Sequence, residues 1–209
     1  MDLKDALKWR YSTKVFDNDK KVDDALMLNI LEMTNLSASS HGMQPFKMIL
    51  INNPETKKKL KDLSFGQENV ENSSHLVIFA ARTDLDEAFV DDCVKQVSLQ
   101  RNVSLDSLSA YKTMLFNSLK SKDDYAKFKW ASNQIYIALG TFLIACASEK
   151  VDACPIGGFS PDKYDEFLDL KKYNLKSVVV ALTGYRHQSD AYQFKAKVRK
   201  PLNEMIVEL

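Results

Sequence analysis

The sequence predicts an α+β or three-layer domain in which helices outnumber strands. Three short apolar runs, at 46–53, 75–82 and 177–185, have the length and composition of buried strands. Stretches with helical periodicity separate them, and the longest, at 85–149, contains no proline and a single glycine. A chain of 209 residues with 45% apolar residues can bury a substantial core around such a sheet.

The first half of the chain should alternate helices with strands. A helix at 2–11 is expected first, because Asp2 can cap it and its apolar residues recur on one face. Pro54 suits the first turn of another helix, at 54–63, whose run of lysines we expect to face water. The other elements expected here are a helix at 23–35, a loop at 36–45 and the strands at 46–53 and 75–82.

The second half of the chain should be helical up to residue 149. The segment 135–147 is almost wholly apolar, which indicates a helix buried in a core or in a subunit interface. Ser160 and Pro161 can cap and begin a helix that runs to about residue 168. The other elements expected here are helices at 85–100, 105–120 and 124–149, a loop at 151–161, a strand at 177–185 and a tail that is strand-like from Met205.

The composition disfavours several classes of protein. A net charge of +1 creates no global field toward nucleic acid or anionic membranes. The apolar run at 135–147 is shorter than the roughly 20 residues of a membrane helix, and the opening residues lack the apolar core of a signal peptide. We therefore expect a soluble, cytoplasmic protein. The three cysteines form no C-x-x-C pair and the three histidines lie far apart, so we assign neither a disulfide framework nor a metal site.

The common nucleotide and hydrolase motifs are missing from the sequence. With six glycines in all, the chain has no G-x-G-x-x-G and no G-x-x-x-x-G-K-[ST]. It also lacks a G-x-S-x-G elbow and an evident pairing of cysteine with histidine. The Rossmann, P-loop, hydrolase and kinase interpretations therefore lose most of their support.

Three short segments could carry chemistry instead. RYSTK places Arg10, Ser12 and Lys14 at alternate positions, and two cations with a hydroxyl can converge on one small anion. KVRK at 197–200 is a second cluster of cations, and CPIGG at 154–158 lets a flat ligand approach bare backbone. Taken singly, each segment has a commoner explanation, as a charged helix end, a solvated tail or a turn.

Taken together and in this order, the segments resemble the FMN-dependent nitroreductase family, particularly its oxygen-insensitive NAD(P)H nitroreductase and dihydropteridine reductase branch. The resemblance runs nearly end to end and includes ALKWRYSTKVFD, SASSHGMQPFKMILI, FGQENVENSSHLVIFAARTD, WASNQIYIALGTFLIACASEKVDACPIGGF, SVVVALTGY and KAKVRKP. It implies one α-β-α domain over 1–209, with a central, mostly antiparallel sheet and a long central helix. It also implies a homodimer in which a C-terminal extension is exchanged.

The resemblance assigns both cationic segments to one phosphate. In the family, the R-x-S-x-K segment and a C-terminal K-x-R pair bind the FMN phosphate, and the former also binds the ribityl chain. The residues that inherit this role are Arg10, Tyr11 (through its backbone), Ser12, Lys14, Lys197 and Arg199. Four cations around a dianionic phosphate would explain local basicity in a chain of net charge +1.

The resemblance places the isoalloxazine ring against two other segments. SASSHGMQP resembles the loop that lines the ring from the neighbouring subunit, which makes Ser39 and Ser40 candidates. PIGG resembles the segment whose backbone N–H groups reach the N5/O4 edge of the ring. A donor at that edge would stabilise negative charge on the reduced flavin. The residues that inherit this role are Pro155, Ile156, Gly157 and Gly158.

Two departures from the branch concern the surroundings of the ring. The branch has Glu where this chain has Gly157, so a backbone contact is retained while a carboxylate is lost. In FGQENV, the Asn and Lys that the branch often has are replaced by Gly66 and Asn69. We expect Gln67 or Asn69 to contact the pyrimidine edge of the flavin.

The implied activity is a ping-pong hydride transfer from NADPH or NADH, through bound FMN, to nitroaromatics, quinones or related acceptors. No side chain need act as acid or base, so no catalytic residue is assigned. Phe65 and Phe116 resemble the aromatic lining of the substrate pocket, and both are equally compatible with core packing. Three alternatives stay open: a flavoprotein of the same fold with a specialised acceptor (a dihydropteridine, enone or dehalogenation substrate), a non-catalytic FMN-binding protein, and a phosphate-ligand protein without flavin.

Overall fold

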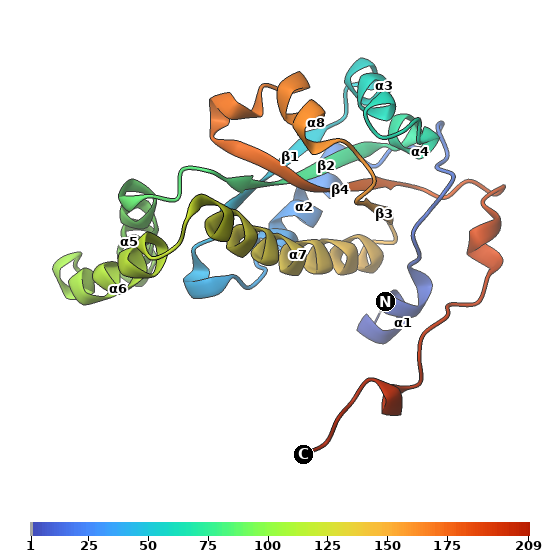
Figure 1. Cartoon of the computed structure of the whole chain (residues 1–209). Coiled ribbons are helices and arrows are strands. Elements are labelled where there is room, and N and C mark those ends of the chain that lie inside the picture. The colour runs from blue at the N-terminus through green and yellow to red at the C-terminus, as the bar shows by residue number, and fades with distance from the viewer. Residues whose placement is uncertain (1) are drawn as a thin grey trace.

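A four-stranded sheet forms the centre of the structure, a computed structural model that describes residues 2–209 (Figure 1). Its strands are β1 (Phe46–Ile51), β2 (His75–Arg82), β3 (Asp152–Ile156) and β4 (Leu175–Gly184). The strands lie in the order β1-β2-β4-β3, and every neighbouring pair is antiparallel. The antiparallel sheet that the family resemblance implies is therefore confirmed.

Helices cover both faces of the sheet. The helices α2 and α7 lie on one face, and α3, α4 and α8 lie on the other (Figure 1). The helices α5 and α6 form a hairpin at one end of the sheet, and α1 packs against α7. This arrangement confirms the expected three layers. The bounds of the helices are α1 Leu3–Trp9, α2 Asp24–Asn35, α3 Pro54–Asp62, α4 Glu68–Asn72, α5 Glu87–Arg101, α6 Ser109–Lys120, α7 Asp124–Ser148 and α8 Pro161–Phe167.

The burial of each strand explains its composition. The central strands β2 and β4 are buried over most of their length, and both are continuous apolar runs rather than alternating ones. Strand β1 lies at the edge and is fully buried only at its ends, Phe46 and Ile51, whereas the residues between them are partly exposed. The edge of β1 that faces away from β2 has no strand beside it within residues 2–209.

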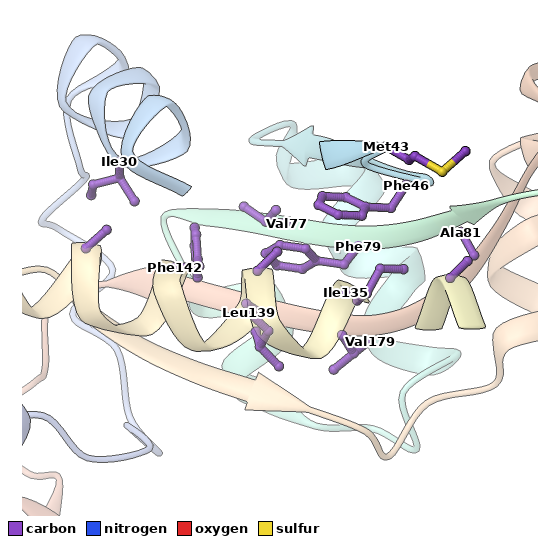
Figure 2. Close-up of a cluster of buried hydrophobic side chains, with 14 of the residues drawn as sticks. Ile30, Met43, Phe46, Val77, Phe79, Ala81, Ile135, Leu139, Phe142 and Val179 are labelled. Carbon is purple, nitrogen blue, oxygen red and sulfur yellow. The ribbon is translucent and has the colours of Figure 1, made fainter. Parts of the chain in front are cut away.

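The long helix α7 supplies one side of the main core. Its residues Ile135 and Phe142 point toward the sheet, beside Phe79 of β2 (Figure 2). The rings of Phe79 and Phe142 meet edge to face, with centroids 5.6 Å apart. By length and composition α7 could cross a membrane, but half of its apolar window is buried inside the domain. Packing against the sheet therefore accounts for much of its apolar character.

Three segments differ from the predictions made on sequence. Residues 152–156, expected in a loop, form the edge strand β3, because pairing with β4 satisfies their backbone on one side. Pro155 is tolerated there because β3 has a full strand on one side only, and the other side carries a single bridge, at Ala153. The short helix α4 was not expected. The tail from Met205 forms no strand, because no other strand lies beside it within the described residues, and it follows a single 3-10 turn at Leu202–Glu204.

One lysine of α3 contradicts the expectation that its lysine run faces water. Lys57 is buried, and its Nζ donates hydrogen bonds to the backbone oxygens of Ser73 and Ser74 just before β2. Burial lowers the pKa of Lys57 to about 8, and the nearby Lys21 acts in the same direction. The side chain thus ties α3 to the connection between α4 and β2.

We predict that Lys57 makes the stability of the fold depend on pH above neutrality. The pKa of Lys57 is about 8 in the folded chain, below its ordinary value of 10.5, so between these values the unfolded chain holds more protons and stability rises with pH. Relative to Lys57→Met, the wild type should gain roughly 2–3 kcal/mol between about pH 8 and pH 10. Urea unfolding across this range measures the gain.

The control for this prediction is Lys58→Met, which removes an exposed lysine from the same helix. Its stability should follow the same pH profile as the wild type. Parallel profiles for Lys57→Met and the wild type would contradict the prediction.

Candidate functional site

The two ends of the chain meet at a cavity of about 330 Å³, which we call the cationic cavity. Six of its lining residues are Lys or Arg, and within residues 2–209 no Asp or Glu lines it, so the cavity presents a positive potential to an anion. The structure therefore brings RYSTK and KVRK together. The lining residues are Lys8, Trp9, Arg10, Tyr11, Ser12, Lys14, Tyr192, Gln193, Lys195, Ala196, Lys197 and Arg199.

The N-terminal segment reaches the cationic cavity by running beside β3. Ser12 forms a parallel bridge with Ala153, which places the segment next to the strand. Thr13 is buried, and its hydroxyl donates a hydrogen bond to Asp152 over 3.4 Å. Because successive side chains of an extended segment point to opposite sides, Thr13 faces the protein while Ser12 and Lys14 face the cavity. The alternate spacing of the motif follows from this geometry.

Asp190 fastens the N-terminal segment to the C-terminal one. Its buried carboxylate accepts hydrogen bonds from the backbone N–H groups of Lys14 (2.8 Å) and Val15 (3.2 Å). The same carboxylate accepts from the hydroxyl of Tyr11 (2.9 Å) and the backbone N–H of Tyr192 (3.0 Å). Burial alone would raise the pKa of Asp190, but these donors outweigh it and hold the pKa below its ordinary value.

A second buried carboxylate, Asp152, holds Arg186 behind the cationic cavity. The guanidinium of Arg186 donates from Nη2 to Oδ1 of Asp152 (2.6 Å) and from Nε to the same oxygen (2.9 Å). It also lies over the rings of Trp9 (4.2 Å to the centroid) and Tyr11 (4.7 Å). The pair thereby fixes the end of α1 against β3 and β4.

Lys197 closes the cationic cavity from the C-terminal side. Its Nζ donates hydrogen bonds to the backbone oxygens of Leu7 and Arg10 at the end of α1. The Nε of Arg10 is buried and has no hydrogen-bond partner in the described residues. Burial lowers the pKa of Arg10, and the positive charge of Arg199 lowers it further. A buried donor without an acceptor is unfavourable, so an anion in the cavity would relieve this site.

The PIGG corner, residues 155–158, begins with the last two residues of β3 and lies beside the start of α4. Gln67 Nε2 donates to the backbone oxygen of Gly158 over 2.7 Å, and Asn69 Nδ2 donates to Sγ of Cys154 over 3.9 Å. A Cβ added at Gly157 would meet no atom within 4 Å, so the backbone there is open to a ligand. The structure thus brings Gln67 and Asn69 to the corner that the resemblance assigns to the flavin ring.

Ser39 and Ser40 lie in the loop between α2 and β1, and within residues 2–209 they do not line the cationic cavity. The backbone N–H of Ser40 donates to Oε1 of Gln134 on α7 over 2.8 Å. The hydroxyl oxygen of Ser39 accepts from the backbone N–H of Gln44 over 3.1 Å. These bonds fix the loop to the core, and its role toward a flavin stays a prediction.

The two aromatic candidates lie in different surroundings. Phe65 is 75% exposed and has a φ of +57°, and the following Gly66 has a φ of +72°, which turns the chain between α3 and α4. Phe116 is half-buried on α6 and packs against the main core. Exposure rules out a core role for Phe65 in this chain, whereas Phe116 is a core neighbour.

Comparison with known proteins decides the family. The profile described as "Nitroreductase family" matches residues 7–185, from the end of α1 to just past β4. The chain belongs to the nitroreductase family. A curated relative from Bacillus subtilis (strain 168), named "Putative NAD(P)H nitroreductase YfkO", is 36% identical over 193 residues and aligns over 87% of each chain. The family and this name support an oxidoreductase.

Solved structures share the nitroreductase fold of this chain. One from Exiguobacterium sibiricum 255-15, described as a "putative nitroreductase in complex with FMN", has a TM-score of 0.85 and 21% identity, covering 100% of this chain and 98% of that one. CLA-ER, an enone reductase of a gut-bacterial fatty acid saturation metabolism, has a TM-score of 0.83 and 18% identity, covering 100% and 98%. At these identities the likeness establishes the fold alone.

The residues that hold the site's segments in place in this nitroreductase-family chain were not predicted from its sequence. Asp152 lies between the apolar residues Val151 and Ala153, and Gln134 directly precedes the apolar run at 135–147, so both positions could have indicated buried polar side chains with partners. Asp190 gives no such signal, because it lies in the polar stretch RHQSDAYQ. Its role becomes visible only when the fold brings it to Tyr11 and Lys14.

Proposed function

We propose that this chain is an FMN-dependent NAD(P)H oxidoreductase that reduces nitroaromatics, quinones or related acceptors by ping-pong hydride transfer. The observation that carries the proposal is the cationic cavity, with its six cations and the buried, unpartnered Nε of Arg10. The relative of the same fold solved with FMN supports the choice of cofactor.

The cationic cavity fits the phosphate of FMN in charge and in donors. Arg10 offers a planar fork of N–H donors, Ser12 a neutral hydroxyl and Lys14 a point charge. Lys197 and Arg199 add positive charge from the C-terminal side. Because no carboxylate lines the cavity within the described residues, a dianionic phosphate would meet attraction from every charged group there.

The PIGG corner fits the edge of a flat ring. Gly157 leaves its backbone open, so its N–H can approach a ring atom without obstruction from a side chain. The amide nitrogen of Gln67 is already committed to the oxygen of Gly158, which leaves the amide oxygen to accept from the imide N–H of the flavin. Asn69 lies one helical turn or less away and can reach the same edge.

Bound FMN would supply the redox chemistry, which is hydride transfer from NADPH or NADH to the acceptor. The chain binds the phosphate, orients the ring on open backbone and holds donors at its edge. The pKa of the Cys154 thiol is raised by burial, although Lys14 and Arg10 act against this, so the thiol stays protonated and is not a nucleophile. We therefore propose no catalytic residue.

We also propose that the chain acts as a homodimer with FMN at the subunit interface. The solvent side of α7 carries Tyr136, Ile137, Gly140 and Ile144 at helical spacing, all of them exposed. Contiguous apolar surface of this kind marks an interaction site. The C-terminal tail is also exposed and apolar, at Leu202, Met205, Ile206 and Val207.

An apolar groove of about 510 Å³ along the open edge of β1 suits the tail of a second copy. The edge strand leaves backbone N–H and C=O groups without partners, and an added strand would pair with them. The groove is lined on its far side by Leu168, Leu170, Tyr173 and Leu175. The strand-like residues from Met205, which pair with no strand within residues 2–209, would then pair with β1 of a second copy.

A specialised acceptor is the second candidate function. The open space at Gly157, where the branch carries Glu, removes a carboxylate from the ring and leaves room for a different acceptor. An enone reductase shares the fold, which supports the enone among the alternatives. Comparing the rates with a nitroaromatic, a quinone and an enone separates the two, because a specialist favours one acceptor strongly.

The deciding experiment is the visible spectrum of the purified protein, followed by anaerobic addition of NADPH or NADH. We expect flavin bands that bleach, because the chain would hold FMN and bring the added nucleotide to its ring. Bands that persist would indicate a non-catalytic flavin protein. A colourless protein that cannot be loaded with FMN would overturn the proposal.

We predict that Arg10→Ala weakens FMN binding by about 10- to 100-fold, because it removes charge-assisted hydrogen bonds to the phosphate. Lys20→Ala serves as the control, since Lys20 pairs with Asp17 (2.9 Å) outside the cationic cavity. Quenching of FMN fluorescence on binding measures both dissociation constants. Equal constants for the two variants would count against the assignment.

We predict that Ile137→Asp converts the dimer into monomers and lowers its FMN content, because a charge is placed in the apolar contact of α7. Leu99→Asp introduces the same charge at an exposed position of α5, away from the apolar solvent side of α7, and its assembly should match the wild type. Sedimentation velocity gives the mass of each species. A wild-type chain that is monomeric with FMN bound would refute the dimer.

A further inference from the structure

A second polar cavity, of about 440 Å³, lies between the loop after α2 and the hairpin of α5 and α6. We call it the hairpin cavity. One wall is the face of α5 between Phe89 and Arg101, and the other is formed by residues 41–44 and by Tyr111 on α6. The hairpin stands at one end of the sheet, outside the three layers (Figure 1). A cavity of this volume is in the range of small-molecule sites.

Several polar side chains on the α5 wall lack partners. Gln96, Gln100 and Arg101 make no side-chain hydrogen bond or ion pair within residues 2–209. Arg82, by contrast, is held by Asp84 through two hydrogen bonds of 2.8 and 2.6 Å. Two amides and one guanidinium are therefore available to a ligand in the hairpin cavity.

Two aromatic rings stand on the opposite wall. The rings of His41 and Tyr111 meet edge to face with centroids 6.1 Å apart, and the Tyr111 hydroxyl donates to the backbone oxygen of His41 over 3.3 Å. This bond ties the loop to α6 and holds both rings in place. Aromatic rings stack on a nucleobase, and glutamine amides can bond the edge of adenine.

Charge along the α5 wall is unevenly distributed. Arg101 ends the helix, whereas Asp92 lies nine positions earlier, about 13 Å away along the helix axis. Asp91 is neutralised by an ion pair with Lys112 of α6. The end of the cavity at Arg101 is thus positive and suits a phosphate group.

The hairpin cavity adjoins the loop that the family resemblance places against the flavin ring of a second copy in the proposed homodimer. His41 and Gly42 line the cavity and directly follow Ser40, whose N–H is fixed by Gln134. A dinucleotide that brings its nicotinamide to the ring must hold its adenosine half close by. The hairpin cavity offers the aromatic, amide and cationic groups that this half requires.

Resting on the proposed function, we infer that the hairpin cavity binds the adenosine half of NADPH and that Arg101 pairs with its 2′-phosphate. The rings of His41 and Tyr111 contact the adenine, and the amides of Gln96 and Gln100 bond the base and the ribose. Arg101 is then the residue that favours NADPH over NADH, which lacks that phosphate. No bond forms or breaks in this cavity.

The test measures the binding of two fragments that lack nicotinamide, 2′-phospho-ADP-ribose and ADP-ribose, to the FMN-loaded protein by calorimetry. The wild type should bind the phosphorylated fragment about 10-fold more tightly, and Arg101→Gln should bring the two dissociation constants within about 2-fold. Lys95→Gln removes a cation from the same helix outside the cavity and should keep the wild-type ratio. The double variant Gln96→Ala, Gln100→Ala should weaken both fragments alike.

An unchanged ratio in Arg101→Gln, or equal binding of both fragments by the wild type, would overturn the site. Anaerobic bleaching of the wild-type flavin separates this result from failure of the proposed function. If NADPH bleaches the flavin while the ratio is unchanged, the reductase stands and the adenosine site falls. If the ratio changes as expected without bleaching, the nucleotide site stands and the reductase falls.

Discussion

The carboxylate of Asp190 is the contact on which the rest of the site depends. It accepts from the backbone of Lys14, 176 positions earlier in the chain, and from the backbone of Tyr192 beside it. The two terminal segments carry mostly positive charge and would otherwise repel each other. A buried carboxylate with several donors fixes their geometry, and this directs Arg10 and Lys197 to one cavity instead of into solvent.

The positive charge of the cationic cavity is not balanced by any lining carboxylate within residues 2–209, and the pKa of one of its lysines reflects this. Burial lowers the pKa of Lys197, and the charges of Arg10 and Arg199 lower it further. A net charge of +1 for the whole chain means that this excess is local. An anion that binds only the folded chain removes the repulsion and stabilises the fold by mass action. The repulsion between the cations of the cavity is therefore also the source of its affinity for an anion.

Elements with strong periodicity could be predicted from sequence, and elements that depend on distant partners could not. The strands β2 and β4 and the helix α7 follow from their own apolar patterns. Strand β3 does not, because Asp152 and Pro155 are typical of a loop in the sequence, and only pairing with β4 in the fold makes this segment a strand. The spacing of RYSTK was visible as a possible anion site, yet Asp190, which positions it, belongs to no pattern and is recognisable only in the fold.

The tail connects the two halves of the proposed function. Lys197 and Arg199 line the cationic cavity, and the apolar residues that could reach a second copy begin at Leu202, about 10 Å further along an extended chain. A phosphate in the cavity would fix Lys197 and Arg199, where the tail begins. The hydrogen bonds of Lys197 to α1 set the direction of the tail. Without an anion, repulsion between the cations would make the start of the tail, at Lys197 and Arg199, less firmly held. Because linkage is reciprocal, binding of the cofactor and exchange of the tail would each favour the other.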